Sequence, residues 1–360
     1  MLRRVRMLVR ALLLLLAAAA LAPMPAAAQD APLAVEEGRF VEINGVQQWI
    51  TIRGRDLANP VLLILHGGPG FSTSFLAPLY ADWERSFTIV QWDQPGSGAT
   101  GLRNLGRPTG AMTVDRYVRD AVTVTEWVRR RLGVRRVVLF GSSWGSLLGL
   151  ELVHRRPDLF SAYVGTSQPV GTRGALVGYQ LALDAARRRG DEAAIAALTR
   201  IGPPPYRIFE DFMVRQIWSN PPGLPPTPQQ AAAGAELVQL MQTPRPGVSY
   251  ISDLPTPPGY DGGFMAALRA TWEEVWSWEA GRLGPRFRIP IFIFQGEVDV
   301  NTPTSVAREW YDGIQAPMKR FEVVPGAGHD VMLFHAPLLR LLETYVRPVA
   351  VGARRTQLRP

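Results

Sequence analysis

Segments that are apolar at every position alternate along the chain with segments whose apolar residues recur every three to four positions. Residues 61–65 read Val-Leu-Leu-Ile-Leu, residues 137–140 read Val-Val-Leu-Phe, and residues 289–294 read Ile-Pro-Ile-Phe-Ile-Phe. Such continuous runs are typical of parallel strands that are covered on both faces. Residues 113–132 instead place their apolar side chains on one helical face, which Thr113 can cap. This alternation predicts an α/β fold with a mainly parallel sheet.

Five further segments complete the predicted sheet. Residues 39–43 and 46–52 alternate between apolar and polar positions, and Asn-Gly joins them, which is a strong signal for a hairpin. The other three strands are predicted at residues 87–92, 162–165 and 321–324. The pattern therefore predicts an eight-stranded, mainly parallel sheet.

The rhythm of strands and helices breaks between residues 168 and 287. Proline-rich segments separate helical stretches here, and no buried strand is evident. Because the strand pattern resumes at residue 289, we interpret 168–287 as an inserted helical cap, or lid. The α/β core is then formed by residues 29–167 and 288–360. A second independent domain is the alternative. The four predicted cap helices are residues 176–189, 192–200, 231–241 and 264–280.

The first 28 residues differ from the rest of the chain. Four arginines precede an apolar run at 11–22, and three alanines at 26–28 offer a cleavage site before Gln29. This arrangement predicts a secretory signal peptide and an exported protein, periplasmic or secreted. An uncleaved membrane anchor is the alternative, but the apolar run is short for a span. We expect no stable membrane insertion after cleavage.

Composition narrows the classes of function. Apolar residues make up 47% of the 360 positions and charged residues 19%, as in globular proteins. The formal net charge is +8 and falls to +4 without residues 1–28, which carry four arginines and no acids. No basic block is interleaved with aromatic residues, so no nucleic-acid partner is expected. The absence of cysteine excludes thiol catalysis and cysteine metal ligands. No metal or other cofactor is expected.

One pentapeptide indicates the chemistry. Residues 141–145 read Gly-Ser-Ser-Trp-Gly and lie between the strand at 137–140 and a helical stretch that Pro157 ends. A Gly-x-Ser-x-Gly sequence between a strand and a helix is typical of a nucleophile elbow, here centred on Ser143. Glycines are needed because a serine on so sharp a turn leaves no room for side chains two residues away. A serine-rich turn without catalytic function is the alternative.

Two more side chains fit the same chemistry. Asp299 and His329, like Ser143, come just after predicted strands, where open α/β sheets place their sites. A serine hydroxyl needs a base within hydrogen-bond reach, and that base needs an acid to fix its tautomer and stabilise its charge. The order Ser, Asp, His is the one used by α/β-hydrolases. His335 is the second choice for the base, and Glu297 is the alternative acid.

An acyl-transfer site also needs donors for the developing oxyanion. The N–H of Trp144, at the start of the helix after the elbow, is the natural first donor. The second is expected from the glycine backbone at 67–68, which follows the strand at 61–65. Each such donor is typically worth about 3 kcal/mol in the transition state.

Four motifs together resemble one known family. They are His-Gly-Gly-Pro-Gly at 66–70, Gly-Ser-Ser-Trp-Gly-Ser at 141–146, Gly-Glu-Val-Asp at 296–299 and Gly-Ala-Gly-His at 326–329. In type and order they look like the proline iminopeptidase branch of the α/β-hydrolases. That family comprises cofactor-independent serine peptidases that release an N-terminal residue, often proline, beneath a helical cap.

The resemblance implies a role for five residues of this chain. Ser143 would be the nucleophile, His329 the base and Asp299 the acid that orients it. The backbone N–H groups of Gly68 and Trp144 would form the oxyanion hole.

The chain departs from the family pattern at two places. Residues 93–96 read Asp-Gln-Pro-Gly, where the family has Asp-Gln-Arg-Gly. The family's Trp-Ser-x-Trp-Glu element, which lies early in the cap, is represented only by Trp-Ser-Trp-Glu at 276–279, late in the cap. Acidic cap residues would hold a substrate ammonium, and tryptophans would form apolar walls or a cation–π face. Alternatively, the tryptophans pack on the core and the glutamates face water. The substrate-binding candidates are Glu273, Glu274, Glu279, Trp276 and Trp278.

Three functions are therefore weighed. The first is an exported aminopeptidase that releases N-terminal residues from short peptides through an acyl-enzyme. The second is a carboxylesterase or lactonase that uses the same three side chains. The third is a binding module that has kept the fold and lost catalysis.

Overall fold

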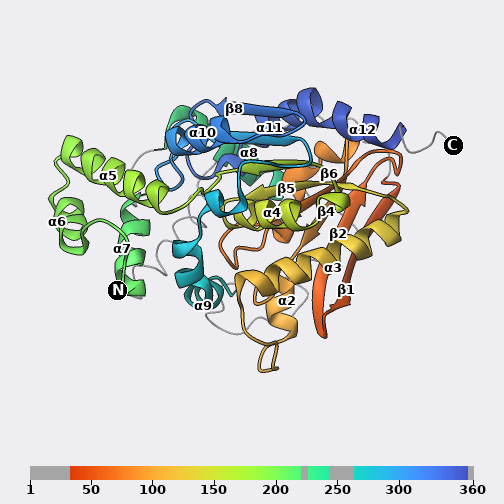
Figure 1. Cartoon of the computed structure of the whole chain (residues 1–360), viewed down its shortest axis with the longest axis horizontal. Helices are drawn as coiled ribbons and strands as arrows, with labels where there is room; N and C mark the ends of the chain where they lie inside the picture. The colour runs from red at the N-terminus through yellow and green to blue at the C-terminus, as the bar shows by residue number, and fades with distance from the viewer. Residues whose placement is uncertain (1–32, 220–225, 243–262, 356–360) are drawn as a thin grey trace.

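The computed structural model describes residues 33–219, 226–242 and 263–355. Its centre is one eight-stranded sheet with the strand order β1-β2-β4-β3-β5-β6-β7-β8 (Figure 1). The predicted signal peptide at 1–28 lies outside the described residues. Within the described ranges, no helix is both long enough and apolar enough to cross a bilayer.

The sheet is mainly parallel, and the predicted fold class is confirmed. β2 pairs antiparallel with β1 and with β4, and every other pair of neighbouring strands is parallel. In the pairing of β3 with β5, Leu65 lies opposite Gly141. The strands are β1 (Val35–Ile43), β2 (Val46–Gly54), β3 (Val61–Leu65), β4 (Thr88–Trp92), β5 (Val137–Ser142), β6 (Phe160–Thr166), β7 (Ile291–Gly296) and β8 (Lys319–Val324).

The continuous apolar runs form the interior strands, as expected. Every residue of the five strands β3 to β7 is buried, whereas the edge strands β1 and β8 carry exposed positions. Successive side chains of a strand point to opposite faces. In β3, Leu63 enters one apolar cluster, while Leu62 and Ile64 enter another. The sheet therefore separates two cores, and both faces need covering helices.

Local signals in the sequence account for the first turn and the first long helix. Asn44 and Gly45 both adopt positive φ values, 48° and 83°, as a two-residue hairpin turn requires. Thr113 accepts a hydrogen bond from the backbone N–H of Arg116 at 3.2 Å and caps the helix. Gly133 ends the helix in the left-handed region, with φ 62°. Both predictions are confirmed.

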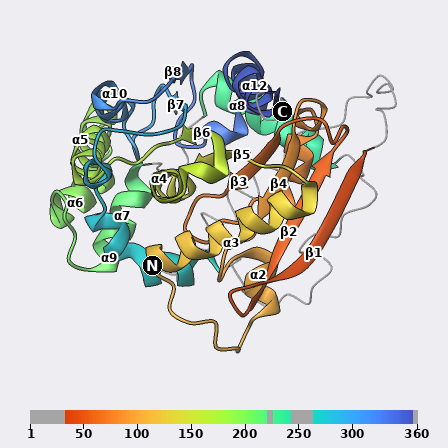
Figure 2. The same ribbon diagram turned by 45° about the vertical axis from the view of Figure 1, so that its right-hand side comes forward.

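Helices cover both faces of the sheet (Figure 2). Apolar side chains of α3, α4 and α10 enter one core, and those of η1, α11 and α12 enter the other. The helices outside the segment between β6 and β7 are α2 (Gly98–Arg103), α3 (Val114–Leu132), α4 (Trp144–Arg155), α10 (Thr304–Gly313), α11 (His335–Leu341) and α12 (Arg347–Arg355). Shorter 3-10 or π turns are η1 (Ser74–Tyr80), η2 (Trp83–Arg85), η3 (Pro157–Leu159), η5 (Ala280–Leu283), η6 (Val331–Leu333) and η7 (Leu342–Val346).

The helices between β6 and β7 pack in three separate regions of the molecule. α5, α6 and α7 pack on one another and extend away from the sheet (Figure 1). α9 lies beside α3, whereas α8 packs against η1 and η6, with Ala233 in the apolar core. Helix α7 is absent from the sequence prediction. The bounds are α5 (Thr172–Arg189), α6 (Glu192–Ile201), α7 (Phe209–Ser219), α8 (Pro228–Gln242) and α9 (Phe264–Ser277).

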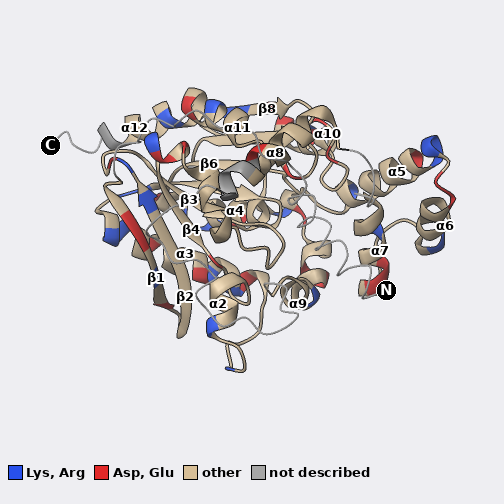
Figure 3. Cartoon of the chain, turned by 180° about the vertical axis from the view of Figure 1, so that it is seen from behind, with Lys and Arg blue, Asp and Glu red and all other residues tan. Residues whose placement is uncertain are grey.

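Charged residues of both signs are interspersed over these elements. In the view from behind, basic and acidic positions alternate on β1, around α6 and near α11 (Figure 3). The edge strand β1 illustrates the pattern, since Arg39 pairs with Glu37 at 3.4 Å. Exposed pairs of this kind contribute about 0–1 kcal/mol each to stability.

Candidate active site

Ser143 lies on a strained turn between β5 and α4. Its φ and ψ angles are 53° and −117°, a region that residues other than glycine rarely adopt. The two flanking glycines are required by close contacts. A Cβ on Gly145 would lie within 3 Å of the Leu65 carbonyl oxygen, and one on Gly141 would lie equally close to the Gly145 carbonyl oxygen. The geometry is that of a nucleophile elbow.

Replacing Gly145 with alanine should destabilise the protein. The new methyl group would press on the backbone of β3, which cannot move aside without disturbing the sheet, so a loss of about 3 kcal/mol is expected. Urea unfolding of the purified variant measures the loss. Gly313→Ala is the matched control, because a Cβ there meets no atom within 4 Å. Equal stability of the two variants would contradict this account of the elbow.

The structure brings the three predicted catalytic side chains together. Ser143 Oγ lies 2.9 Å from His329 Nε2. On the other side of the ring, His329 Nδ1 lies 3.1 Å from each carboxylate oxygen of Asp299. These distances allow a proton to pass from the hydroxyl to the imidazole while the carboxylate fixes the ring.

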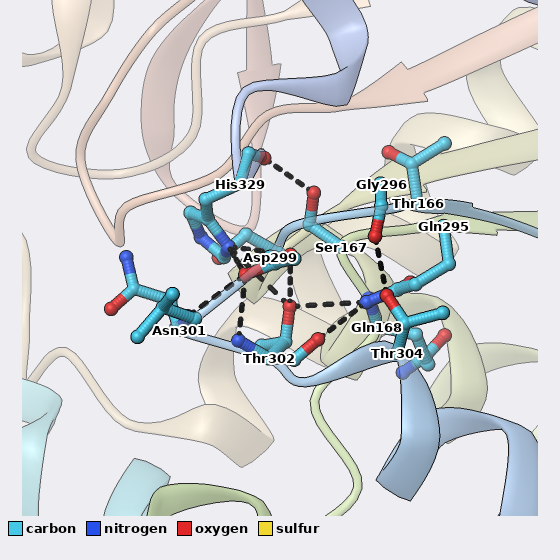
Figure 4. Close-up of polar contacts among 12 residues, drawn as sticks. Thr166, Ser167, Gln168, Gln295, Gly296, Asp299, Asn301, Thr302, Thr304 and His329 are labelled. Carbon is cyan, nitrogen blue, oxygen red and sulfur yellow. Dashed lines mark hydrogen bonds and ion pairs between the residues drawn. The ribbon is translucent and has the colours of Figure 1, made fainter. Parts of the chain in front are cut away.

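Asp299 is held in place by the loop after β7 (Figure 4). Its Oδ1 accepts hydrogen bonds from the backbone N–H groups of Asn301 and Thr302, at 2.8 and 2.9 Å. Its Oδ2 accepts a hydrogen bond from Thr302 Oγ1 at 2.6 Å. Burial alone would raise the pKa of Asp299, but His329 and these donors outweigh it and lower the pKa. The carboxylate therefore stays ionised opposite the imidazole.

The same pairing changes the pKa of His329. Burial disfavours the charged imidazolium, but the Asp299 carboxylate outweighs burial, so the pKa of His329 is raised above its usual value. A base with a raised pKa takes up the hydroxyl proton more readily.

A second layer of hydrogen bonds links the strand ends (Figure 4). Gln295 Nε2 donates to the Thr302 carbonyl at 2.6 Å, and Gln295 Oε1 accepts from the Gln168 N–H at 3.0 Å. Ser167 Oγ donates to the carbonyl of His329 at 2.5 Å. Sequence reasoning missed these residues. Their only signal is position, since all follow or end β6 and β7.

The alternative base and acid serve other purposes. His335 Nε2 pairs with Glu236 Oε1 of α8 at 3.0 Å. Glu297 accepts the N–H of Gly326 at 2.8 Å and thereby shapes the loop that carries the base. Neither residue contacts Ser143 or His329 through the hydrogen bonds recorded for the described chain.

The predicted oxyanion donors lie beside Ser143. Gly68 and Trp144 line the same cavity as Ser143 and His329, and Trp144 is the first residue of α4. Gly68 has φ 117°, and a Cβ there would collide with the Gly70 backbone, so glycine is required.

The Asp-Gln-Pro-Gly turn at residues 93–96 is hydrogen-bonded to the residues around the predicted oxyanion donors. Gln94 Oε1 accepts a hydrogen bond from the Trp144 indole at 2.9 Å, and Gln94 Nε2 donates to the His66 carbonyl at 3.1 Å. The His66 ring lies 2.8 Å from the Gly67 carbonyl, and burial lowers the pKa of His66 to about 4. His66 therefore orders the glycine loop as a neutral ring, and the arginine missing at Pro95 leaves these contacts intact.

The cavity beside Ser143 has a volume of about 110 Å³. Helices α7 and α9 line it with aromatic side chains that pack edge to face, such as Phe212 on Trp276 with centroids 5.1 Å apart. Both predicted tryptophans, Trp276 and Trp278, line the cavity. Its other large apolar lining residues are Leu147, Val170, Leu268, Trp272, Val275 and Val306.

None of the three predicted glutamates lines this cavity. Glu274 accepts the N–H of Val114 at 2.9 Å, and Glu279 accepts the N–H of Thr172 at 2.8 Å. Both carboxylates therefore satisfy the free N–H groups at helix starts, where the helix dipole favours them. Glu273 is exposed. The structure therefore does not bring these three predicted glutamates to the cavity lining.

No cluster of three or more His, Asp or Glu side chains suited to a metal ion occurs in the described part of the chain.

Comparison with known proteins places the chain in a class. A family model described as alpha/beta hydrolase fold matches residues 60–201. A proline iminopeptidase-related protein from Thermus thermophilus has a similar structure, with a TM-score of 0.58 and 21% identity over 88% of this chain and 99% of that one. The proline iminopeptidase of Mycobacterium smegmatis is also similar, with a TM-score of 0.52 and 21% identity over 88% of this chain and 100% of that one. This chain has the α/β-hydrolase fold.

Curated relatives narrow the class. The protein named probable aminopeptidase YbaC, from Bacillus subtilis strain 168, is 27% identical over 292 residues, which is 80% of this chain and 89% of that protein. The proline iminopeptidase of Lactobacillus delbrueckii subsp. lactis is 25% identical over 307 residues, 81% and 91% of the two chains. The hydrolase is therefore similar to proline iminopeptidases, and the resemblance seen in its motifs is confirmed.

Proposed function

We propose that this α/β hydrolase is a serine hydrolase that works through an acyl-enzyme on Ser143. The observation that carries the proposal is the continuous chain of contacts from Ser143 Oγ through the His329 ring to Asp299. His329 takes the hydroxyl proton as Ser143 attacks the substrate carbonyl, and then gives it to the leaving group. Water activated by His329 next attacks the acyl-enzyme and restores Ser143.

The backbone N–H groups of Gly68 and Trp144 would stabilise the oxyanion in both steps. The N–H of Trp144 is free for this purpose because it lies in the first turn of α4, where no intrahelical acceptor is available. The positive end of the helix dipole adds to the stabilisation.

Aminopeptidase action on short peptides is the first candidate activity. The names of the curated relatives support it. A carboxylesterase or lactonase is the second candidate. It is favoured by the cavity lining, which among the described residues contains no carboxylate to hold an ammonium group.

A substrate panel on one preparation decides between the two candidates. Prolyl and alanyl anilides are compared with 4-nitrophenyl esters of short acids. Turnover of the anilides supports the aminopeptidase. Turnover of the esters alone overturns the aminopeptidase and leaves the esterase. No turnover of either series would overturn the serine hydrolase itself.

The cap glutamates should contribute to stability rather than to substrate binding. Replacing Glu274 or Glu279 with glutamine weakens a bond to a helix-start N–H, and a loss of about 1 kcal/mol in the free energy of unfolding is expected. KM should stay within twofold, because neither side chain lines the cavity. Thermal unfolding and kinetics on the best panel substrate measure both quantities. Glu273→Gln is the control, and a tenfold rise in KM for any of the three would contradict this assignment.

A further inference from the structure

A buried cation lines the catalytic cavity. Arg215 belongs to α7 and is only 2% exposed. It lines the same cavity as Ser143 and His329. Arginine is seldom so deeply buried unless an anion accompanies it, because removing its charge from water costs several kcal/mol.

Most of the guanidinium N–H groups of Arg215, but not all of them, have hydrogen-bond acceptors in the protein. Arg215 Nη1 donates to Gln216 Oε1 at 2.6 Å and to Asn301 Oδ1 at 2.8 Å. Nη2 donates to the carbonyls of Val300 and Asn301, at 3.2 and 3.3 Å. The remaining donor, Nε–H, is buried and has no partner. Four acceptors therefore hold the planar group in place, and one buried N–H of a cavity-lining residue is left without a protein acceptor in the described chain.

Every one of those acceptors is neutral. Among the described residues, no carboxylate lies within ion-pair distance of Arg215, and Asp299 is already bound by His329 and Thr302. The Trp276 ring, 6.0 Å from the guanidinium carbon, offers only a cation–π contact. Burial lowers the pKa of Arg215 to about 10, so the group stays charged at neutral pH. The Asp299 carboxylate attracts the guanidinium through space but lies outside ion-pair distance, so the cavity has a fixed positive charge with no carboxylate of the described residues bonded to it.

We propose that Arg215 is a specificity residue that binds a carboxylate of the substrate, carried either by the acyl group or by the leaving group. A carboxylate in the cavity would accept the free Nε–H and would neutralise the buried charge. Charge-assisted bonds to arginine are among the stronger polar contacts, and the apolar walls strengthen them further. This inference rests on the proposed serine hydrolase and gives that enzyme an anionic substrate class.

Two pairs of substrates test the proposal and separate the two sources of the carboxylate. 4-Nitrophenyl monosuccinate is compared with 4-nitrophenyl butyrate for the acyl side, and alanyl-alanine with alanyl-alanine amide for the leaving-group side. For at least one pair we expect the charged member to have the higher kcat/KM. For that pair we compare the ratio of kcat/KM for the charged member to kcat/KM for the neutral member. Arg215→Gln should lower this ratio by about 10- to 100-fold, as expected for losing a hydrogen bond to a charged group.

The control is a surface arginine on the same cap. Arg269→Gln removes an equal charge from α9, where Arg269 pairs with Glu210 and is exposed, and the ratio should stay as in the unmodified enzyme. An unchanged ratio in Arg215→Gln, or an equal fall in both variants, would overturn the proposal.

Binding to an inactive enzyme keeps the test independent of catalysis and of folding defects in Arg215 variants. Succinate is titrated into the Ser143→Ala protein by calorimetry at constant ionic strength. Saturable binding that chloride does not reproduce supports the proposal, and its absence overturns it. Succinate binding together with no hydrolysis of any panel substrate would instead mean that the proposed function fails while the carboxylate site stands.

Discussion

Replacing Ser143 with alanine should lower kcat by about four to six orders of magnitude. Removing the nucleophile eliminates the acyl-enzyme, so that only the oxyanion donors and substrate positioning continue to act. The measurement is kcat on the best panel substrate, together with labelling by a fluorophosphonate, which reacts with activated serines. Labelling should be complete in the unmodified protein and absent in the variant.

Ser142→Ala provides the matched control. Ser142 is the last residue of β5 and also lies in the elbow sequence, but within the described chain it is the Ser143 hydroxyl, not that of Ser142, that lies at hydrogen-bond distance from His329. This variant should keep its labelling and its kcat within about threefold. Labelling that persists in Ser143→Ala would show that another serine is the nucleophile and would overturn the proposed function.

Replacing Asp299 with asparagine should lower kcat by about 10⁴-fold. The amide would favour the wrong tautomer of His329, with its proton on the nitrogen that faces Ser143. The pH profile should move as well. His329 acts as a base only when neutral, so activity of the unmodified enzyme is lost as the pH falls through the raised pKa of His329. Without the carboxylate that pKa drops, and the acid limb of kcat/KM shifts to lower pH.

Glu297→Gln separates this effect from a general loss of charge in the same loop. Glu297 shapes the loop by accepting the Gly326 N–H, and it does not contact the imidazole. Its replacement should leave the acid limb in place. If both variants shift the profile equally, or if Asp299→Asn leaves it unmoved, Asp299 is not the orienting acid.

The main elements and the three central side chains could be predicted because their signals are local. A buried strand followed at once by Gly-x-Ser-x-Gly identifies Ser143, and Asp299 and His329 each follow a strand in the same way. Parallel strands end at one edge of the sheet, so three distant segments necessarily meet there. The Asn-Gly hairpin and the capped helix α3 also depend on neighbouring residues only.

The helices between β6 and β7 could not be predicted to the same depth because their contacts join residues that are far apart in sequence. The bond between Glu274 and the Val114 N–H spans 160 positions, and that between Glu279 and Thr172 spans 107. An amphipathic helix shows which face is polar, but not whether a neighbouring helix start or a cavity lies opposite it. The same applies to Arg215, whose acceptors at 300 and 301 follow another strand.

The pairing of β3 with β5 has a consequence for how the site works. The loop that carries Gly68 follows β3 directly, and the elbow follows β5, and these two strands are neighbours with Leu65 opposite Gly141. One ladder of backbone hydrogen bonds in the sheet interior therefore sets the spacing between the proposed nucleophile, Ser143, and both proposed oxyanion donors. Such preorganised dipoles need no rearrangement when charge develops on the substrate. The proposed base and acid, His329 and Asp299, follow β8 and β7, which are likewise neighbours in this sheet.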